Sequence, residues 1–181
     1  MSWEFRPPDG FVYEMTISGT KFSLKERTQH PENQELVRYS LTRVWSRDLP
    51  LVLFIMHNPA TMCEQDDDIT IKKCMKWASI NGYGGLLVGN LLPFIKGNTK
   101  KDEILEEENR KAVRELINRC STVVYAWSNK IKAAPDWLEK YIMQDKTPYC
   151  LGLSSDNCPL LPTWDSGKLI LFNTGLQKSK P

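Results

Sequence analysis

An asparagine and a group of aspartates follow a short apolar segment in the first half of the chain, and these residue types can support chemistry. The apolar segment covers residues 51–56 and stops at Asn58-Pro59, and Asp66–Asp68 come soon after it. A carboxylate can orient a water molecule or stabilise developing positive charge, and an amide can bind the edge of a base. We therefore predict a functional site here, with Asn58, Asp67 and Asp68 as catalytic candidates and Thr61 and Thr70 as substrate-binding candidates.

Each of these residues also has a purely structural explanation. Asp68 can cap the helix that is expected to begin there, and Asp67 can oppose the dipole of that helix. Asn58 with Pro59 can simply form a turn, and His57 is better explained as a packed or surface residue than as a base. Adjacent carboxylates can hold Mg²⁺, but consecutive residues at a helix start point in different directions. We therefore predict no metal site and no cofactor.

The elements around these residues follow an alternating strand and helix pattern. Short apolar segments at 51–56, 86–89, 122–126 and 149–153 are separated by helical segments that begin near 68, 102 and 135. This pattern is typical of an α/β fold whose strands run parallel and whose helices flank the sheet. The sequence therefore predicts a mainly parallel four-stranded sheet. Asn109 falls on the apolar stripe of the second helix, where a buried amide needs partners.

Parallel strands end at one edge of their sheet, so the segments that follow them should lie close together. Amides can hydrogen-bond to base edges, aromatic rings can stack on bases, and lysines can contact phosphates. Trp127 can equally be a core residue, and the lysines that follow these strands can equally form a solvated face of the protein. The further candidates are Asn90, Phe94, Asn109 and Trp127 for substrate binding and Lys96, Lys100, Lys101, Lys130 and Lys132 for nucleic-acid binding.

The N-terminal part of the sequence predicts antiparallel strands that are added to the α/β core. Residues 11–17 and 21–24 flank a Ser-Gly turn and predict a hairpin. Residues 37–45 alternate with a period of two and predict another strand. The predicted organisation is a single domain over 1–181, with an N-terminal extension over 1–36, an α/β core over 37–173 and a loose tail over 174–181. On the alternating strand, Val37, Tyr39, Leu41, Arg43 and Trp45 share one face.

The amino-acid composition argues against membrane-spanning, disulfide-rich and zinc-binding classes of protein. The chain has 181 residues, a net charge of +2 and 41% hydrophobic residues, which is ordinary for a globular domain. No apolar segment reaches the roughly 20 residues of a membrane span, and an apolar signal-peptide core is missing from the N-terminus, so a cytoplasmic protein without membrane contact is expected. The five cysteines include no C-x-x-C pair, which argues against a disulfide framework and a zinc site.

Several motifs resemble, in the same order, a bacterial and phage family known as domain of unknown function 1643. The family pattern opens with R-Y-x-L-x-R-x-W and continues with N-P-S-T-A, D-D-P-T, G-Y-G-G, N-L and A-W-G. This resemblance covers about residues 37–165 and implies the fold more than an activity. The corresponding segments here are Arg38–Trp45, Asn58–Met62, Asp67–Thr70, Gly82–Gly85, Asn90-Leu91 and Ala126–Ser128.

A second resemblance concerns mechanism. The strand that ends at Asn58-Pro59 is similar to the first motif of the uracil-DNA glycosylase superfamily, which implies a parallel sheet of that type and cleavage of the bond between a base and its sugar. Met56 and Ala60 stand where that motif has glycines, and Leu161 stands where the superfamily has a histidine.

The predicted function is therefore that of a protein acting on nucleic acid or a nucleotide, related to base glycosylases and used in phage or bacterial DNA modification or repair. The alternative is a non-catalytic module that binds nucleic acid or protein on the same fold. Leu161 and Ala60 favour that alternative.

Overall fold

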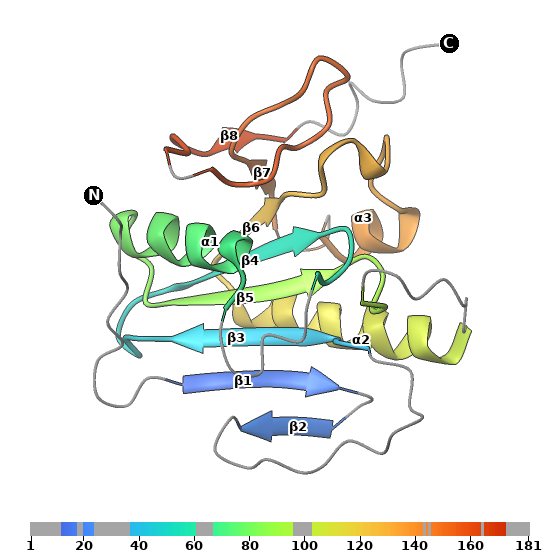
Figure 1. Cartoon of the computed structure of the whole chain (residues 1–181). Helices are drawn as coiled ribbons and strands as arrows, with labels where there is room; N and C mark the ends of the chain where they lie inside the picture. The colour runs from blue at the N-terminus through green and yellow to red at the C-terminus, as the bar shows by residue number, and fades with distance from the viewer. Residues whose placement is uncertain are drawn as a thin grey trace.

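The computed structural model shows one mixed sheet with helices on both of its faces (Figure 1). It describes residues 37–60, 67–95, 103–142, 144, 146–163 and 165–172, and the backbone of 12–17 and 20–23. The strands are β1 (Val12–Ile17), β2 (Thr20–Ser23), β3 (Ser40–Val44), β4 (Leu51–Met56), β5 (Gly85–Asn90), β6 (Thr122–Tyr125), β7 (Pro148–Cys150) and β8 (Ile170–Leu171). The α-helices are α1 (Ile69–Ile80), α2 (Glu103–Arg119) and α3 (Asp136–Ile142), and a short 3-10 helix covers Ser128–Lys130.

The sheet has the strand order β2-β1-β3-β5-β4-β6-β7-β8. Neighbouring strands run parallel from β5 through β4 and β6 to β7, whereas β3, β1 and β2 on one side and β8 on the other are antiparallel. The α/β class and the N-terminal hairpin are thus confirmed. The four expected parallel strands are present, and antiparallel strands pair with both outer members of this group, so the whole sheet is mixed and has eight strands.

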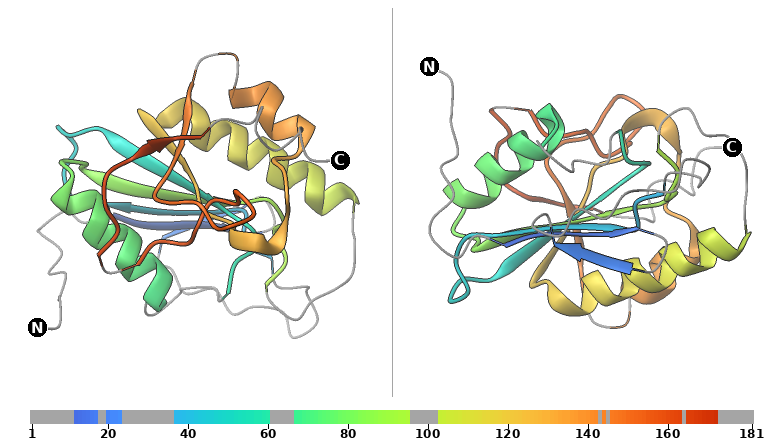
Figure 2. Two further views of the ribbon diagram at one scale, coloured as in Figure 1. Left: turned by 90° about the horizontal axis from the view of Figure 1, so that it is seen from above. Right: turned by 60° about the horizontal axis from the view of Figure 1, so that its bottom comes forward.

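Two apolar layers explain why the central strands are buried on both faces. Val52, Phe54 and Met56 of β4 pack with α1, while Leu53 and Ile55 of the same strand pack with α2 and α3. Successive side chains of a strand point to opposite faces, so a strand covered on both sides is apolar throughout. Figure 2 shows α1 on one face of the sheet and α2 with α3 on the other.

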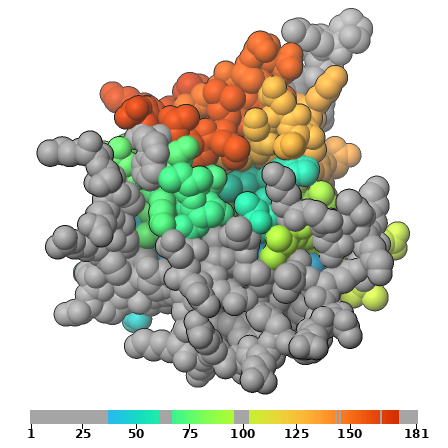
Figure 3. Space-filling model, viewed as in Figure 1, coloured from blue at the N-terminus to red at the C-terminus, as the bar shows by residue number. Residues whose placement is uncertain are grey.

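The segment after β7 closes over the α1 side of the molecule. The indole N–H of Trp77 on α1 donates a hydrogen bond of 2.8 Å to the carbonyl of Gly167. Figure 3 shows the surface of α1 adjoining the surface of the C-terminal segments. None of the helices in the described part of the chain has the length and apolar character that a membrane crossing requires.

The G-Y-G-G segment has a structural role at the amino ends of the parallel strands. Gly82 ends α1 with a φ of +80°, a conformation that glycine adopts without cost. A Cβ on Gly84 would lie only 2.2 Å from the carbonyl oxygen of Ser46, so a larger residue cannot fit there. The indole N–H of Trp45 donates to the carbonyl of Tyr83 at 2.8 Å. These motif residues therefore join β3 to β5 at the end of the sheet that lies opposite the candidate site.

Candidate functional site

The carboxyl edge, defined here as the edge where β5, β4, β6 and β7 end, holds the segments that the sequence singled out. The first two of these segments are joined by backbone hydrogen bonds. The N–H of Leu91 donates to the carbonyl of Met56 at 2.8 Å, and the N–H of Leu92 donates to that of His57 at 2.9 Å. Asn58 and Asn90 therefore lie at the same end of the sheet, as their strand positions predicted.

Asn58 is half-buried and makes contacts only at the limit of hydrogen-bond length with backbone. Its Nδ2 lies 3.4 Å from the carbonyl of Pro59 and 3.5 Å from that of Phe94. Its Oδ1 lies 2.8 Å from Nδ1 of His57. Asn58 thus connects the segment after β4 with the segment after β5. A residue that only formed a turn would not need this contact with a second segment.

Asn90 is the most unusual polar side chain at the carboxyl edge. It is 0% exposed, and among the described residues neither Nδ2 nor Oδ1 of its amide has a hydrogen-bond partner. Leu86 and Val88 of the same strand face α1, so strand alternation places the Asn90 side chain on that face. A buried polar group without partners costs about 1–3 kcal/mol, so the amide of Asn90 is a candidate for contact with water or a ligand.

Asn109 supports the end of β5 from the opposite face. Its Nδ2 donates to the carbonyl of Asn90 at 2.8 Å and to that of Leu91 at 3.3 Å. The buried amide on the apolar stripe of α2 therefore has the partners that the sequence analysis required, and they are backbone carbonyls. No residue in the described ranges donates a hydrogen bond to its Oδ1. In this geometry Asn109 positions the backbone on which Asn90 is carried.

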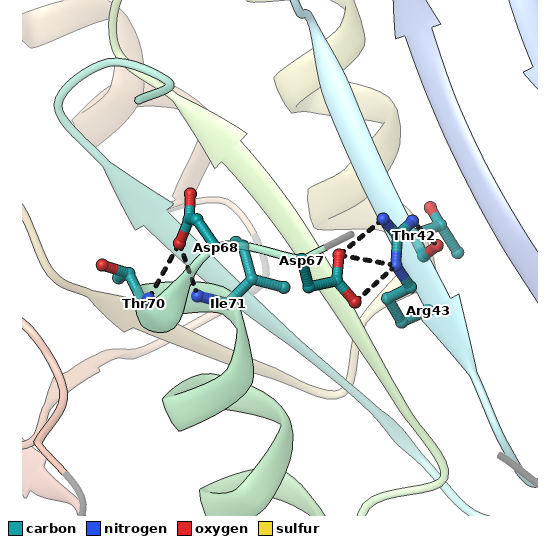
Figure 4. Close-up of polar contacts among 6 residues, drawn as sticks. All are labelled: Thr42, Arg43, Asp67, Asp68, Thr70 and Ile71. Atoms are coloured by element: carbon teal, nitrogen blue, oxygen red, sulfur yellow. Dashed lines mark hydrogen bonds and ion pairs between the residues drawn. The ribbon is translucent and has the colours of Figure 1, made fainter. Parts of the chain in front are cut away.

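Asp67 pairs with a buried arginine that the sequence analysis did not include among the site residues. Asp67 is 8% and Arg43 is 1% exposed. The carboxylate accepts from Arg43 Nη2 at 2.6 Å and from Nε at 3.0 and 3.1 Å, as Figure 4 shows. The available signal was an arginine on the same strand face as Leu41, because a buried guanidinium needs a carboxylate partner.

Asp68 is the N-cap of α1. Its Oδ1 accepts from the backbone N–H of Thr70 at 2.8 Å and from that of Ile71 at 3.0 Å (Figure 4). Thr70 itself lies in the first turn of α1 and is half-buried. The structural explanation of Asp68 thus holds, and its carboxylate and that of Asp67 are directed to different partners.

Replacing Asp68 with alanine should lower the free energy of unfolding by about 1 kcal/mol, because two N–H groups of the first helical turn lose their acceptor. Urea unfolding followed by far-UV circular dichroism measures this change. The matched control is Asp48→Ala, which removes an exposed carboxylate outside the helices and should change stability by less than about 0.5 kcal/mol. An equal effect of both variants would contradict the capping role.

The two aromatic candidates are core residues. Trp127 is 1% exposed and packs against Tyr125, with ring centroids 4.4 Å apart, and against Phe172. It belongs to the layer of α2 and α3, whereas Asp67 precedes α1 on the other face. Phe94 is buried with Val37 and Tyr39. Neither ring offers an open face for stacking, although the buried indole N–H of Trp127 meets no acceptor among the residues that the structure describes.

The segment after β6 meets the segment after β7 at the carboxyl edge. The N–H of Ser128 donates to the carbonyl of Pro159 at 2.7 Å. Ser128 has a φ of +58°, which explains why glycine suits this position in the A-W-G pattern of the resembled family. Leu161 is 44% exposed, so it presents an apolar surface close to this junction.

The lysine candidates are only partly described. Lys130 and Lys132 are exposed after β6, which is compatible with either a phosphate contact or a solvated face. Thr61, Lys96, Lys100 and Lys101 lie outside the described residues. Their predicted roles therefore remain predictions.

The described thiols and carboxylates do not form a further reactive centre. Cys74, Cys120 and Cys150 are buried, as predicted. Burial raises the pKa of the Cys120 thiol to about 11 and that of Cys74 well above its usual value, so both stay protonated near neutral pH. Within the described ranges, no group of three or more histidine, cysteine, aspartate or glutamate side chains is arranged to hold a metal ion.

Comparison with known proteins gives one match. The family described as "Protein of unknown function (DUF1643)" matches residues 38–163. No curated protein and no solved structure matches the chain. The matched residues include the parallel strands β4 to β7 and the helices α1 to α3. Because this match covers well over half of its length, the chain belongs to the DUF1643 family.

Proposed function

We propose that this protein binds a nucleobase, carried by a nucleotide or a nucleic acid, at the carboxyl edge of its parallel strands. In the enzymatic form of this proposal it is related to base glycosylases and cleaves the bond between base and sugar. Asn58 would then orient water, and the amide of Asn90 would bind the edge of the base.

The buried amide of Asn90 carries the proposal. It has a donor and an acceptor side by side, neither of which is paired with a residue in the described part of the chain, and a nucleobase edge has the complementary acceptor and donor. A hydrogen bond from Asn109 to the carbonyl of Asn90 fixes the backbone that carries the Asn90 amide. Because this backbone is already ordered, little of its entropy is lost when a ligand binds. Ligands of open α/β sheets bind at the carboxyl ends of the strands, where Asn90 lies.

A specific observation favours the second candidate, a binding module without catalysis. Both carboxylates proposed as catalytic have structural partners, because Asp67 pairs with Arg43 and Asp68 caps α1. Leu161 stands where the resembled glycosylases have a histidine. The enzyme and the binding module are distinguished by an assay for free base, released from oligonucleotides that carry uracil, mismatched thymine or modified pyrimidines. Base release supports the enzyme, and binding without release supports the module.

Replacing Asn90 with leucine should weaken ligand binding about 5- to 150-fold, because a paired amide contributes about 1–3 kcal/mol of base recognition. The fold should keep its stability or gain some, since an apolar side chain of similar size removes an unpaired buried group. Calorimetric titration with deoxynucleoside monophosphates and with a single-stranded oligonucleotide measures the first effect. Urea unfolding measures the second.

The matched control is Asn118→Leu, which changes an exposed asparagine on α2 and should leave binding unchanged. The oligonucleotide titration is repeated at low and high salt, because contacts of Lys130 and Lys132 with phosphates would make binding fall steeply as salt is added. Equal binding by Asn90→Leu and the unmodified protein would refute the role of Asn90. Absence of binding to every ligand would refute the proposed function.

A further inference from the structure

The orientation of the Asn58 amide is determined by its surroundings. Its Nδ2 faces the backbone carbonyls of Pro59 and Phe94, at 3.4 and 3.5 Å. A flipped amide would place its oxygen against these two carbonyl oxygens, which accept hydrogen bonds and donate none. The Oδ1 atom must therefore face His57, where it lies 2.8 Å from Nδ1.

This orientation selects one protonation form of His57. An amide oxygen only accepts hydrogen bonds, so Nδ1 of His57 must carry the proton that is donated to it. In a neutral imidazole only one ring nitrogen carries a proton, and Nε2 is then left with a free lone pair. Among the described residues, Nε2 has no hydrogen-bond partner, and His57 is half-buried at the carboxyl edge.

We propose that His57 is the hydrogen-bond acceptor that the carboxyl edge offers to a ligand and that Asn58 is the residue that positions it. Asn58 holds the ring with Nδ1 protonated, so that Nε2 accepts a hydrogen bond from an N–H or O–H group of the bound ligand. This inference rests on the proposed function for the nature of the ligand, and it gives His57 and Asn58 one joint role.

The selected tautomer can be observed in the protein without ligand. The chain contains two histidines, His30 and His57, so a long-range proton–nitrogen NMR spectrum of ¹⁵N-histidine-labelled protein is simple, and His57→Gln assigns it. At about pH 8, where an unperturbed imidazole is neutral, we expect a protonated Nδ1 and an unprotonated Nε2. Asn58→Ala should mix the tautomers, while Asn58→Asp, which retains an acceptor, should keep the selection.

Adding the deoxynucleoside monophosphate that binds most tightly should shift the Nε2 signal of His57 and leave that of His30 in place. His57→Gln should weaken this binding at least 5-fold, with unchanged unfolding in urea. A protonated Nε2 in the free protein overturns the inference, and so does nucleotide binding that leaves the Nε2 signal unmoved. If no nucleotide binds, the proposed function fails, and the tautomer of the free protein alone decides whether Asn58 sets the protonation of His57.

Discussion

Replacing Asp67 with asparagine is expected to lower the free energy of unfolding by about 3–5 kcal/mol. The asparagine keeps the shape of the side chain but removes the negative charge that lies 2.6 Å from the buried guanidinium of Arg43, and breaking a buried ion pair by neutralising one partner is strongly destabilising. Equilibrium unfolding in urea, followed by tryptophan fluorescence, measures the loss. Asp48→Asn, at an exposed position, is the control and should change stability by less than about 0.5 kcal/mol.

A double variant tests whether the pair itself or the charge left behind causes this loss. Arg43→Met with Asp67→Leu replaces both partners with apolar side chains, and such replacements of a buried pair are often neutral or stabilising. The double variant should therefore be more stable than Asp67→Asn alone. If Asp67→Asn costs less than about 1 kcal/mol, the ion pair contributes little and Asp67 is available for another role.

This result also governs how activity measurements on Asp67 are interpreted. A glycosylase-like enzyme would lose base release when its catalytic carboxylate is neutralised. In this fold, however, the same substitution breaks the buried ion pair with Arg43, so activity could fall because the protein unfolds. Only a variant with native stability at the assay temperature can assign catalysis to Asp67.

Replacing Trp127 with alanine is expected to cost about 3–5 kcal/mol of stability, which is typical of removing a large buried aromatic side chain. Its ring fills the space between Tyr125 and Phe172 in the layer of α2 and α3. Trp127→Phe retains most of this packing and should cost less than about 1.5 kcal/mol. Chemical denaturation followed by far-UV circular dichroism compares both variants without depending on the indole signal.

The phenylalanine variant separates packing from ligand contact. Because the indole N–H of Trp127 has no hydrogen-bond partner within the described segments, its removal costs no hydrogen bond to them. A loss of nucleotide binding in Trp127→Phe with a retained fold would therefore assign the N–H to the ligand. A stability of Trp127→Ala within about 1 kcal/mol of the unmodified protein would contradict the core role of the ring.

Local patterns along the chain determined the elements and their order. The apolar segment 51–56, the aspartate at its helix start and the Asn-Gly at its helix end predicted β4 and α1 almost to the residue, because strand periodicity and helix capping act over a few neighbouring positions. The same logic predicted that Asn58 and Asn90 share an edge, since parallel strands end together. The strand predicted over 37–45 proved shorter, because residues before Ser40 form only an isolated bridge from Val37 to Phe94.

Tertiary structure alone decided what each candidate does. Arg43 and Asp67 are separated by 24 positions, and only the packing of β3 beside the start of α1 brings them together. Trp127 is a core residue because Tyr125 and Phe172 pack against its ring, although its sequence position at the end of β6 is equally suited to an open site. Asn90 was identifiable as a polar residue at a strand end. Whether its amide is paired depends on every side chain packed around it, and that property arises only when the whole chain has folded.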